Sequence, residues 1–243
     1  MRSPWRTPLH RDVGLICLAD GIVGVSFGAA SVAAGLPWWV PVALSALVFA
    51  GGSQIAAVGV ALAGGSALAA VAAGAVLNTR LLPYGLAVAD VLHPGDAQPA
   101  GQPGTSSRQR WRRLARLLAG THLITDESVA FALRQREPAA RRRAFWTCGG
   151  ALFVSWNAAT ALGVALGSAV RDTGAFGLDA TFPAVMLALA LPTLAARPAR
   201  IAAGTGAVIA VALTPVLPAG LPLLAALAGL ATRWRGPRAG AAR

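Results

Sequence analysis

The stretch VPVALSALVFAGGSQIAAVGVALAGG, residues 40–65, decides the class of fold, because it contains no charged residue. Residues 144–170 form a second uncharged run. About 20 apolar residues cross a bilayer core of about 30 Å, so each run is long enough to span. The whole chain is 56% hydrophobic and 12% charged, with a mean hydropathy of +0.61, whereas soluble domains are about a quarter charged. The sequence therefore predicts an all-α, polytopic integral membrane protein; a soluble all-α protein with buried helices is the alternative.

Arginine clusters between the apolar runs predict the orientation of the chain. The net charge is +12 and all 21 basic residues are arginine. They occur in clusters rather than along one basic face, which argues against a nucleic-acid partner. Because basic loops favour the cytoplasm, Arg2, Arg6 and Arg11 place the N-terminus there, and the cluster ending at Arg243 does the same for the C-terminus. The next apolar run, 13–35, is long enough for an uncleaved first helix rather than a signal peptide.

A break inside 37–64 resolves a conflict in this topology. If 13–35, 37–64 and 66–92 all crossed the membrane, the arginine-rich segment 108–116 would lie outside, against the positive-inside rule. The Gly-Gly-Ser-Gln sequence at 51–54 interrupts the middle of 37–64, and glycine pairs mark turns. We therefore expect 37–64 to form two half-helices that enter and leave the membrane on the same outer side.

A second break is predicted in THLITDESVAFAL, residues 121–133. Arginine clusters at 108–116 and 134–143 flank this stretch, so both of its ends favour the cytoplasm. A re-entrant hairpin over about 114–133 satisfies both flanks.

Capping signals support the two breaks. Ser53 is expected to cap a short helix that ends at Gly64 and Gly65, and Thr125 a helix that ends near Arg134. Two helix N-termini would then point at the bilayer centre, which is how transporters build a midplane binding site. The likeness of SQIAAVGVAL to DESVAFAL suggests an inverted repeat.

We expect about six or more transmembrane helices and two re-entrant segments in a single transmembrane domain, 1–243, with a flexible cytoplasmic loop at 93–110. The remaining crossings are 144–170, 178–196, 201–216 and 218–232.

Charged residues inside the apolar segments are candidates for a site. Asp126 and Glu127 either favour the dipole of a helix N-terminus, by about 0.3–1 kcal/mol, or serve a function that offsets the cost of several kcal/mol for a carboxylate at membrane depth. Because successive helical residues point about 100° apart, the two acids are expected to have different roles. Arg80 lies midway along 66–89, where it either binds a ligand or forms a structural ion pair with an intramembrane Asp.

Other residues have weaker signals. Gly24 with Gly28, and Gly163 with Gly167, have the spacing of close helix packing. Asp20 and Asp179 are expected near helix ends as caps, and His122 as a packing residue or a proton relay. Cys17 and Cys148 lie in apolar runs, so a disulfide is not expected.

Six motifs resemble, in order and spacing, the AzlC-type branched-chain amino acid export permeases. They are FGAASVAAGLP, FAGGSQIAA, NTRLLPYGLAVADVL, TDESVAFAL, LFVSWNAATALGVALG and GLDATFPAVMLALALP, and the resemblance covers about residues 14–195. It implies a multispanning bacterial plasma (inner) membrane exporter of valine, leucine and isoleucine that works with a small AzlD-type membrane subunit. The chain differs from the family where Leu81 stands in place of the usual His.

The residues and the resemblance together predict a site for a zwitterion. Arg80 and the helix N-terminus at Ser53 suit a carboxylate, and Asp126 or Glu127 suits an ammonium group or a coupling proton. Phe49 and Phe131 are expected, with Trp156, to contact an aliphatic side chain. The predicted binding residues are Ser53, Gln54, Asn78, Arg80, Asp126, Glu127, Trp156 and Asn157.

No motif of an enzyme or of a metal or ATP site accompanies these residues. Three scattered His and two apolar Cys do not form a nucleophile and base pair or a metal-ligand set. We therefore expect no catalytic residue, no metal and no cofactor, and an ion gradient as the energy source. The alternatives are a scaffold subunit of a larger complex, or a transporter of another small zwitterionic or neutral substrate.

Overall fold

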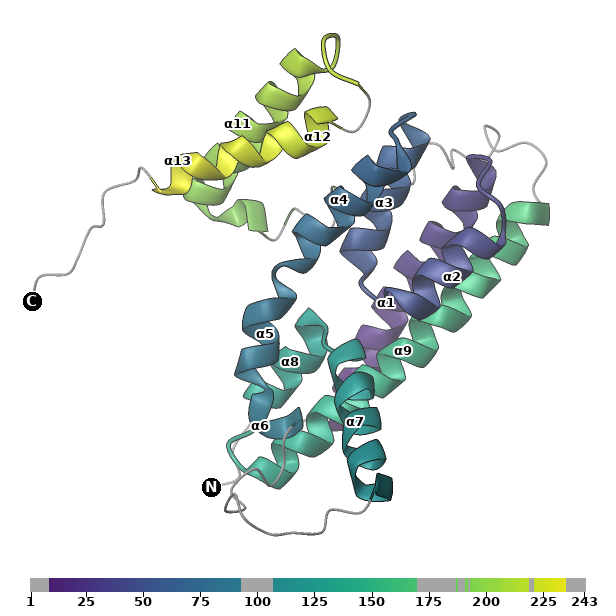
Figure 1. The fold of residues 1–243 in the computed structure, drawn as a ribbon, viewed down its shortest axis with the longest axis vertical. Helices are drawn as coiled ribbons and strands as arrows, with labels where there is room; N and C mark the ends of the chain where they lie inside the picture. The colour runs from purple at the N-terminus through teal and green to yellow at the C-terminus, as the bar shows by residue number, and fades with distance from the viewer. Residues whose placement is uncertain are drawn as a thin grey trace, which may run out of the picture. The chain divides into compact units, whose positions relative to one another are not determined.

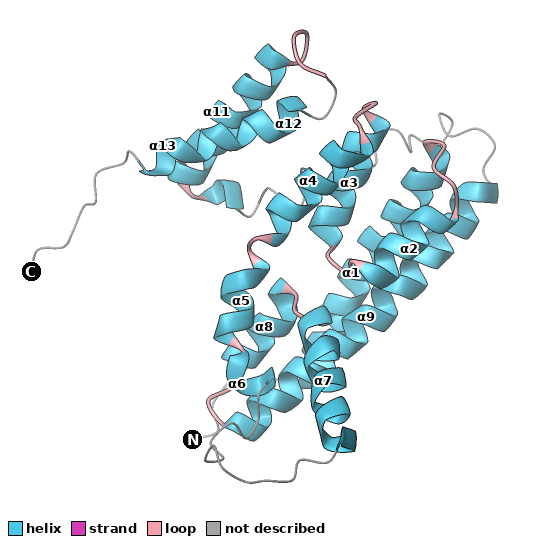
Figure 2. Ribbon diagram, viewed as in Figure 1, coloured by secondary structure: helices cyan, strands magenta, loops and turns pink. Residues whose placement is uncertain are grey.

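The computed structural model describes residues 9–92, 107–169, 187, 191, 193–218 and 221–234. Every element in these ranges is a helix (Figure 2), as the composition predicts. The chain forms two compact units. Unit 1 comprises residues 1–51 and 78–170, and unit 2 comprises residues 52–77 and 171–243.

Figure 1 shows the helices in chain order. Those of the N-terminal and central parts are α1 (Leu9–Ala33), α2 (Trp39–Leu47), α3 (Gly51–Leu62), α4 (Ala67–Asn78), α5 (Leu81–Ala87), α6 (Ala89–Leu92), α7 (Ser107–His122), α8 (Asp126–Leu133) and α9 (Pro138–Ala169). The C-terminal ones are η2 (Thr193–Ala195), α11 (Arg197–Leu213), α12 (Leu221–Ala225), η3 (Ala226–Leu230) and α13 (Ala231–Trp234).

Three segments among the described residues are long and apolar enough to cross a membrane: Leu9–Ala33, Ala67–Ala87 and Pro138–Ala169. They correspond to the predicted crossings 13–35, 66–92 and 144–170. The predicted crossing at 201–216 is α11, and that at 218–232 is three short helical pieces rather than one helix. Most of 178–196 lies outside the described residues, as does most of the predicted loop at 93–110. Its last four residues, 107–110, are already helical in α7.

Glycines bring α1 and α9 into backbone contact, as their spacing predicts. A Cβ on Gly28 would collide with the carbonyl oxygen of Thr160, and one on Gly163 with that of Val25. A Cβ on Gly167 would lie 2.7 Å from the oxygen of Ala29. These contacts leave no room for side chains, so small residues at these positions set the approach of the two helices.

We expect Gly163→Val to destabilise the protein by about 3 kcal/mol or more, because the added atoms meet the backbone of α1 rather than a movable side chain. The measurement is thermal unfolding of the purified protein in detergent. Gly150→Ala is the matched control on the same helix, since nothing lies within 4 Å of a Cβ there. An unfolding temperature unchanged by Gly163→Val would contradict this account of the α1–α9 seam.

The predicted break in 37–64 is present, but it lies earlier than expected. The chain leaves helical geometry between α2 and α3, where Phe49 has a φ of 41°. Gly51 and Gly52 are the first residues of α3, and Ser53 follows them inside its first turn, so the expectation that Ser53 caps this helix is wrong. A left-handed non-glycine residue costs about 1–3 kcal/mol. Burial of the Phe49 ring against Phe153, 5.0 Å away between centroids, offsets it.

The break before α8 is confirmed with its cap. Thr125 Oγ1 accepts a hydrogen bond from the Ser128 amide at 3.1 Å, and Ser128 Oγ accepts one from the Thr125 amide at 2.9 Å. This reciprocal capping box satisfies two donors at the helix start. α8 then ends at Leu133, close to the predicted Arg134.

A third break, which the sequence analysis did not predict, divides α4 from α5 at Thr79 and Arg80. Pro83 explains it, because its ring has no amide proton and would clash with the carbonyl of Thr79 in a continuous helix. Proline is tolerated in the first turn of a new helix, and Pro83 is the third residue of α5. The break places Arg80 at the turn between α4 and α5, as the N-cap residue of α5.

Candidate functional site

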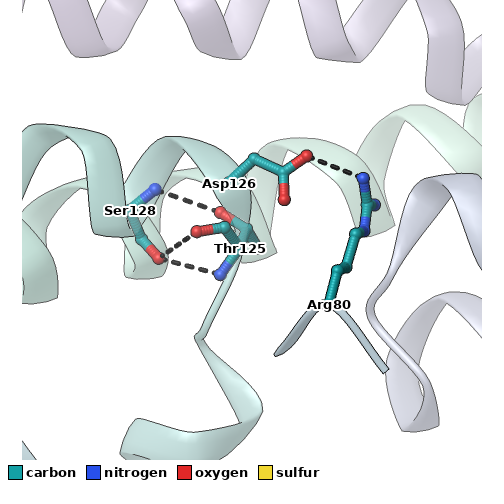
Figure 3. Close-up of polar contacts among 4 residues, drawn as sticks. All are labelled: Arg80, Thr125, Asp126 and Ser128. Atoms are coloured by element: carbon teal, nitrogen blue, oxygen red, sulfur yellow. Dashed lines mark hydrogen bonds and ion pairs between the residues drawn. The ribbon is translucent and has the colours of Figure 1, made fainter. Parts of the chain in front are cut away.

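Arg80 and Asp126 form an ion pair between the third break and the start of α8. Arg80 Nη1 donates to Asp126 Oδ2 at 2.8 Å, and the two side chains are 42% and 41% exposed (Figure 3). The partners are 46 residues apart in sequence. The ion pair with an Asp that was predicted as one alternative for Arg80 is therefore present, with Asp126 as the partner.

The capping box leaves the Asp126 carboxylate available for this pairing. Thr125 and Ser128 bond each other's amides, while the Asp126 side chain points away from them towards Arg80 (Figure 3). A role for Asp126 limited to the helix dipole would not direct its carboxylate at a cation on another helix. The geometry is that of an interhelical polar site.

Two carboxyl or amide oxygens beside this pair have no donor in hydrogen-bonding geometry among the described residues. They are Oδ1 of Asp126 and Oδ1 of Asn78, both buried. The Tyr84 hydroxyl also lies close enough to interact with the Asp126 carboxylate. A buried acceptor without a donor costs about 1–3 kcal/mol. The site therefore suits a molecule that brings hydrogen-bond donors.

Further acidic groups surround Asp126. Glu127 follows it in the first turn of α8, and Asp20 of α1 interacts electrostatically with both acids. Asp20 was expected near a helix end, but it lies in the middle of α1, which begins at Leu9 and ends at Ala33, so that expectation is wrong. The acids near Asp126 outnumber the arginine that pairs with it, which favours the binding of a cation. Asp179, the other expected cap, lies outside the described residues.

Trp156 and Asn157 of α9 lie against α1 and α2 within unit 1. The Trp156 ring stacks on Phe27, 6.1 Å between centroids, and faces Gly51. Asn157 Oδ1 accepts from Ser45 Oγ at 2.9 Å, and its Nδ2 donates to the Phe153 carbonyl. Both residues have packing roles here, and their part in substrate binding stays a prediction.

Ser53 and Gln54 belong to unit 2, where they are buried in the first turn of α3. A Cβ on Gly74 of α4 would lie 3.4 Å from the Ser53 carbonyl oxygen, an ordinary van der Waals distance, so α4 passes next to the start of α3. Ser53 and Gln54 therefore belong to a different unit from Arg80 and Asp126, and their part in substrate binding stays a prediction.

The other aromatic and titratable candidates have defined neighbours. His122 Nε2 lies 3.0 Å from the Ala46 carbonyl oxygen, and its ring contacts Phe49 and Phe153. This is a packing arrangement at the second break, and a proton relay through His122 stays a prediction. Phe131 is buried, with the Arg134 guanidinium 5.4 Å from its ring centre.

Two residues near the ion pair were not among the predicted binding residues. Asp20 is one, and an acid well inside the first apolar run was the signal for it. Tyr84 is the other, and its position four residues after Arg80 places it one helical turn away.

Long apolar helices packed through glycines, with charged residues held between them, are typical of helical membrane proteins. A family model described as AzlC protein matches residues 15–170. The match covers more than half of the chain and includes Asp20, Arg80 and Asp126, so the chain belongs to the AzlC family. No curated protein and no solved structure matches it. Membership of this family is consistent with a function related to membrane transport.

Proposed function

We propose that the protein is a secondary transporter that exports branched-chain amino acids such as valine, leucine and isoleucine. The observation that carries the proposal is the half-exposed Arg80–Asp126 pair with unpartnered acceptor oxygens beside it. Family membership supports transport. The substrate class and the direction of transport rest on the resemblance of the motifs and on the chemistry below.

A zwitterion matches both halves of the pair. Its carboxylate accepts the bidentate hydrogen bonds that the Arg80 guanidinium offers. Its ammonium brings three donors, which suit Oδ1 of Asp126 and Oδ1 of Asn78, the two buried oxygens without a donor. Substrate binding then exchanges one internal ion pair for two with the ligand, so neither charge is left without a partner.

The aliphatic side chain of the substrate needs an apolar wall. We assign it to Phe49, Phe131 and Trp156, as the sequence analysis did. One methylene in such a wall is worth only about 1–3 kcal/mol, so valine, leucine and isoleucine should compete with one another. A different small zwitterionic or neutral substrate is the second candidate. It would differ from valine, leucine and isoleucine only in the part that contacts the apolar wall.

Export requires an energy source, and the acidic excess around Arg80 supplies a means of coupling. Asp20 and Glu127 lie within electrostatic range of one another. Either can bind a proton when the substrate ammonium is absent, which links the movement of protons to that of substrate. We therefore propose coupling to an ion gradient, without a catalytic residue, metal or cofactor.

The experiment is counterflow of labelled valine in proteoliposomes that contain the purified chain, with and without a small AzlD-type membrane subunit. We expect counterflow with the subunit present, competed by leucine and isoleucine. Its absence under both conditions, with correctly inserted protein, would favour the scaffold alternative. Full activity of the chain alone would remove the proposed partner.

The proposed topology has the termini in the cytoplasm of a bacterium, further crossings beyond the three candidate spans, and re-entrant segments at the first two breaks. Cysteines introduced at Ser107 and Ala139, on either side of α7 and α8, are expected to react with a membrane-impermeant maleimide only from the cytoplasmic side. Reaction from opposite sides would mean that the segment between them crosses the membrane. A parent without Cys17 and Cys148 keeps the background low.

A further inference from the structure

Helix α7 has a basic face and an apolar stripe that the proposed function does not use. Its arginines are all exposed: Arg108, Arg110, Arg112, Arg113 and Arg116. The large apolar residues Trp111, Leu114 and Leu118 are 70%, 43% and 62% exposed. Their spacing of three and four residues aligns them along one side of the helix.

A different side of α7 attaches it to unit 1. Leu117 packs against the cluster that contains Val88 and Phe145. A Cβ on Gly120 would collide with the side chain of Leu92 and lie 3.4 Å from the Trp146 ring. At about 100° per residue, Leu117 and Gly120 lie away from the stripe of Trp111, Leu114 and Leu118. The stripe is therefore not the side by which α7 joins the core.

We propose that the N-terminal half of α7, before the re-entrant segment that begins near residue 114, lies in the membrane interface and binds the headgroups of anionic phospholipids. The stripe matches the boundary between headgroups and acyl chains, where tryptophan is favoured. The arginines on the flanks and opposite face reach the phosphates with paired hydrogen bonds. α6, α7 and the start of α9 lie at the same end of unit 1 (Figure 1).

The combination favours a lipid surface over the two other partners for a basic helix. Nucleic acid would engage the arginines but leave three large apolar side chains in water. A soluble acidic protein would need an apolar groove beside its charges. An anionic bilayer offers phosphates to the arginines and acyl chains to the apolar stripe. The apolar helices already place this chain in a bilayer.

The test uses the full chain reconstituted in vesicles of phosphatidylcholine with 30% phosphatidylglycerol, one of the two lipids being brominated in each sample. Bromine quenches nearby tryptophan, and the difference between wild type and Trp111→Phe isolates the Trp111 signal. We expect brominated phosphatidylglycerol to quench Trp111 several-fold more, per lipid, than brominated phosphatidylcholine. Arg110→Gln should reduce this preference about fivefold, since each basic residue near an anionic surface contributes about 1 kcal/mol. High salt should reduce it as well.

Arg142→Gln is the matched control, because Arg142 is also an exposed arginine but lies near the start of α9. It should leave the Trp111 preference unchanged. Equal quenching by the two lipids would overturn the proposed headgroup selectivity. No quenching by either would place α7 off the bilayer and favour a protein or nucleic-acid partner. Because Trp111 and Arg110 are exposed, neither variant should impair folding.

Discussion

Asp126→Asn is expected to reduce valine transport at least a hundredfold, while the protein reaches the membrane at normal abundance. The change removes the charge that pairs with Arg80 and, in the proposed function, with the substrate ammonium. In the bound state the substrate covers both charges, and truncating one partner of such a covered charge pair costs about 2–5 kcal/mol of binding. A hundredfold loss corresponds to about 2.7 kcal/mol. The start of α8 should persist, because Thr125 and Ser128 provide its cap.

The measurement is valine counterflow at pH 6, 7 and 8, normalised to the amount of inserted protein. Glu127→Gln is the matched control, an adjacent acid neutralised on the same helical turn. We expect a smaller loss of transport for Glu127→Gln, because the proposed site pairs the ammonium with Asp126 and not with Glu127. If both variants transport at the wild-type rate across this pH range, the acidic pair is structural.

Arg80→Gln is expected to abolish valine transport, and exchange of the two charges is expected not to restore it. A purely structural ion pair would tolerate the exchange, because Arg80→Asp combined with Asp126→Arg keeps opposite charges in contact. In the proposed site the exchange is expected to fail, because Asn78, Asp20 and Glu127 keep their positions. These groups would then lie next to the introduced arginine, where the substrate ammonium cannot bind.

Folding and transport can be separated in this experiment. For two side chains about two-fifths exposed, an ion pair contributes only about 0–1 kcal/mol of stability. Arg80→Gln should therefore lower the unfolding temperature by no more than a few degrees while transport is lost. Recovery of transport in the exchanged variant would identify the pair as structural and remove the proposed binding role.

The helix breaks could be predicted where local chemistry specifies them. Thr125 and Ser128 form their cap within four residues, so the second break was correctly placed. The first break lies a few residues earlier than predicted, because Phe49 rather than a glycine takes the left-handed conformation. The packing of its ring on Phe153 stabilises that conformation. The third was missed although Pro83 was visible, since an apolar run conceals where one helix stops and another begins.

The site could be predicted only in part. An arginine within an apolar segment requires a partner, and the sequence offered acids for it, but which acid depends on how α5 meets α8. Asp20 illustrates the limit. Its distance from the helix ends follows from where α1 starts, and its electrostatic contact with Asp126 and Glu127 follows from the packing of distant elements. Local patterns contain neither fact.

The two ends of α5 are attached to different helices, one end by an arginine of α9 and the other at the third break. At its far end, the Arg141 guanidinium donates to the Ala87 carbonyl and lies 3.5 Å from the Asp90 carboxylate, which fastens that end to α9. At its near end, Arg80 pairs with Asp126 of α8, beside the apolar contacts that Leu81 and Tyr84 make with the cluster containing Val129 and Ala132. A ligand that takes over both charges would remove the ionic tie and leave the apolar contacts of Leu81 and Tyr84 as the attachment of α5 to α8, while the glycine contacts of α1 and α9 are unaffected.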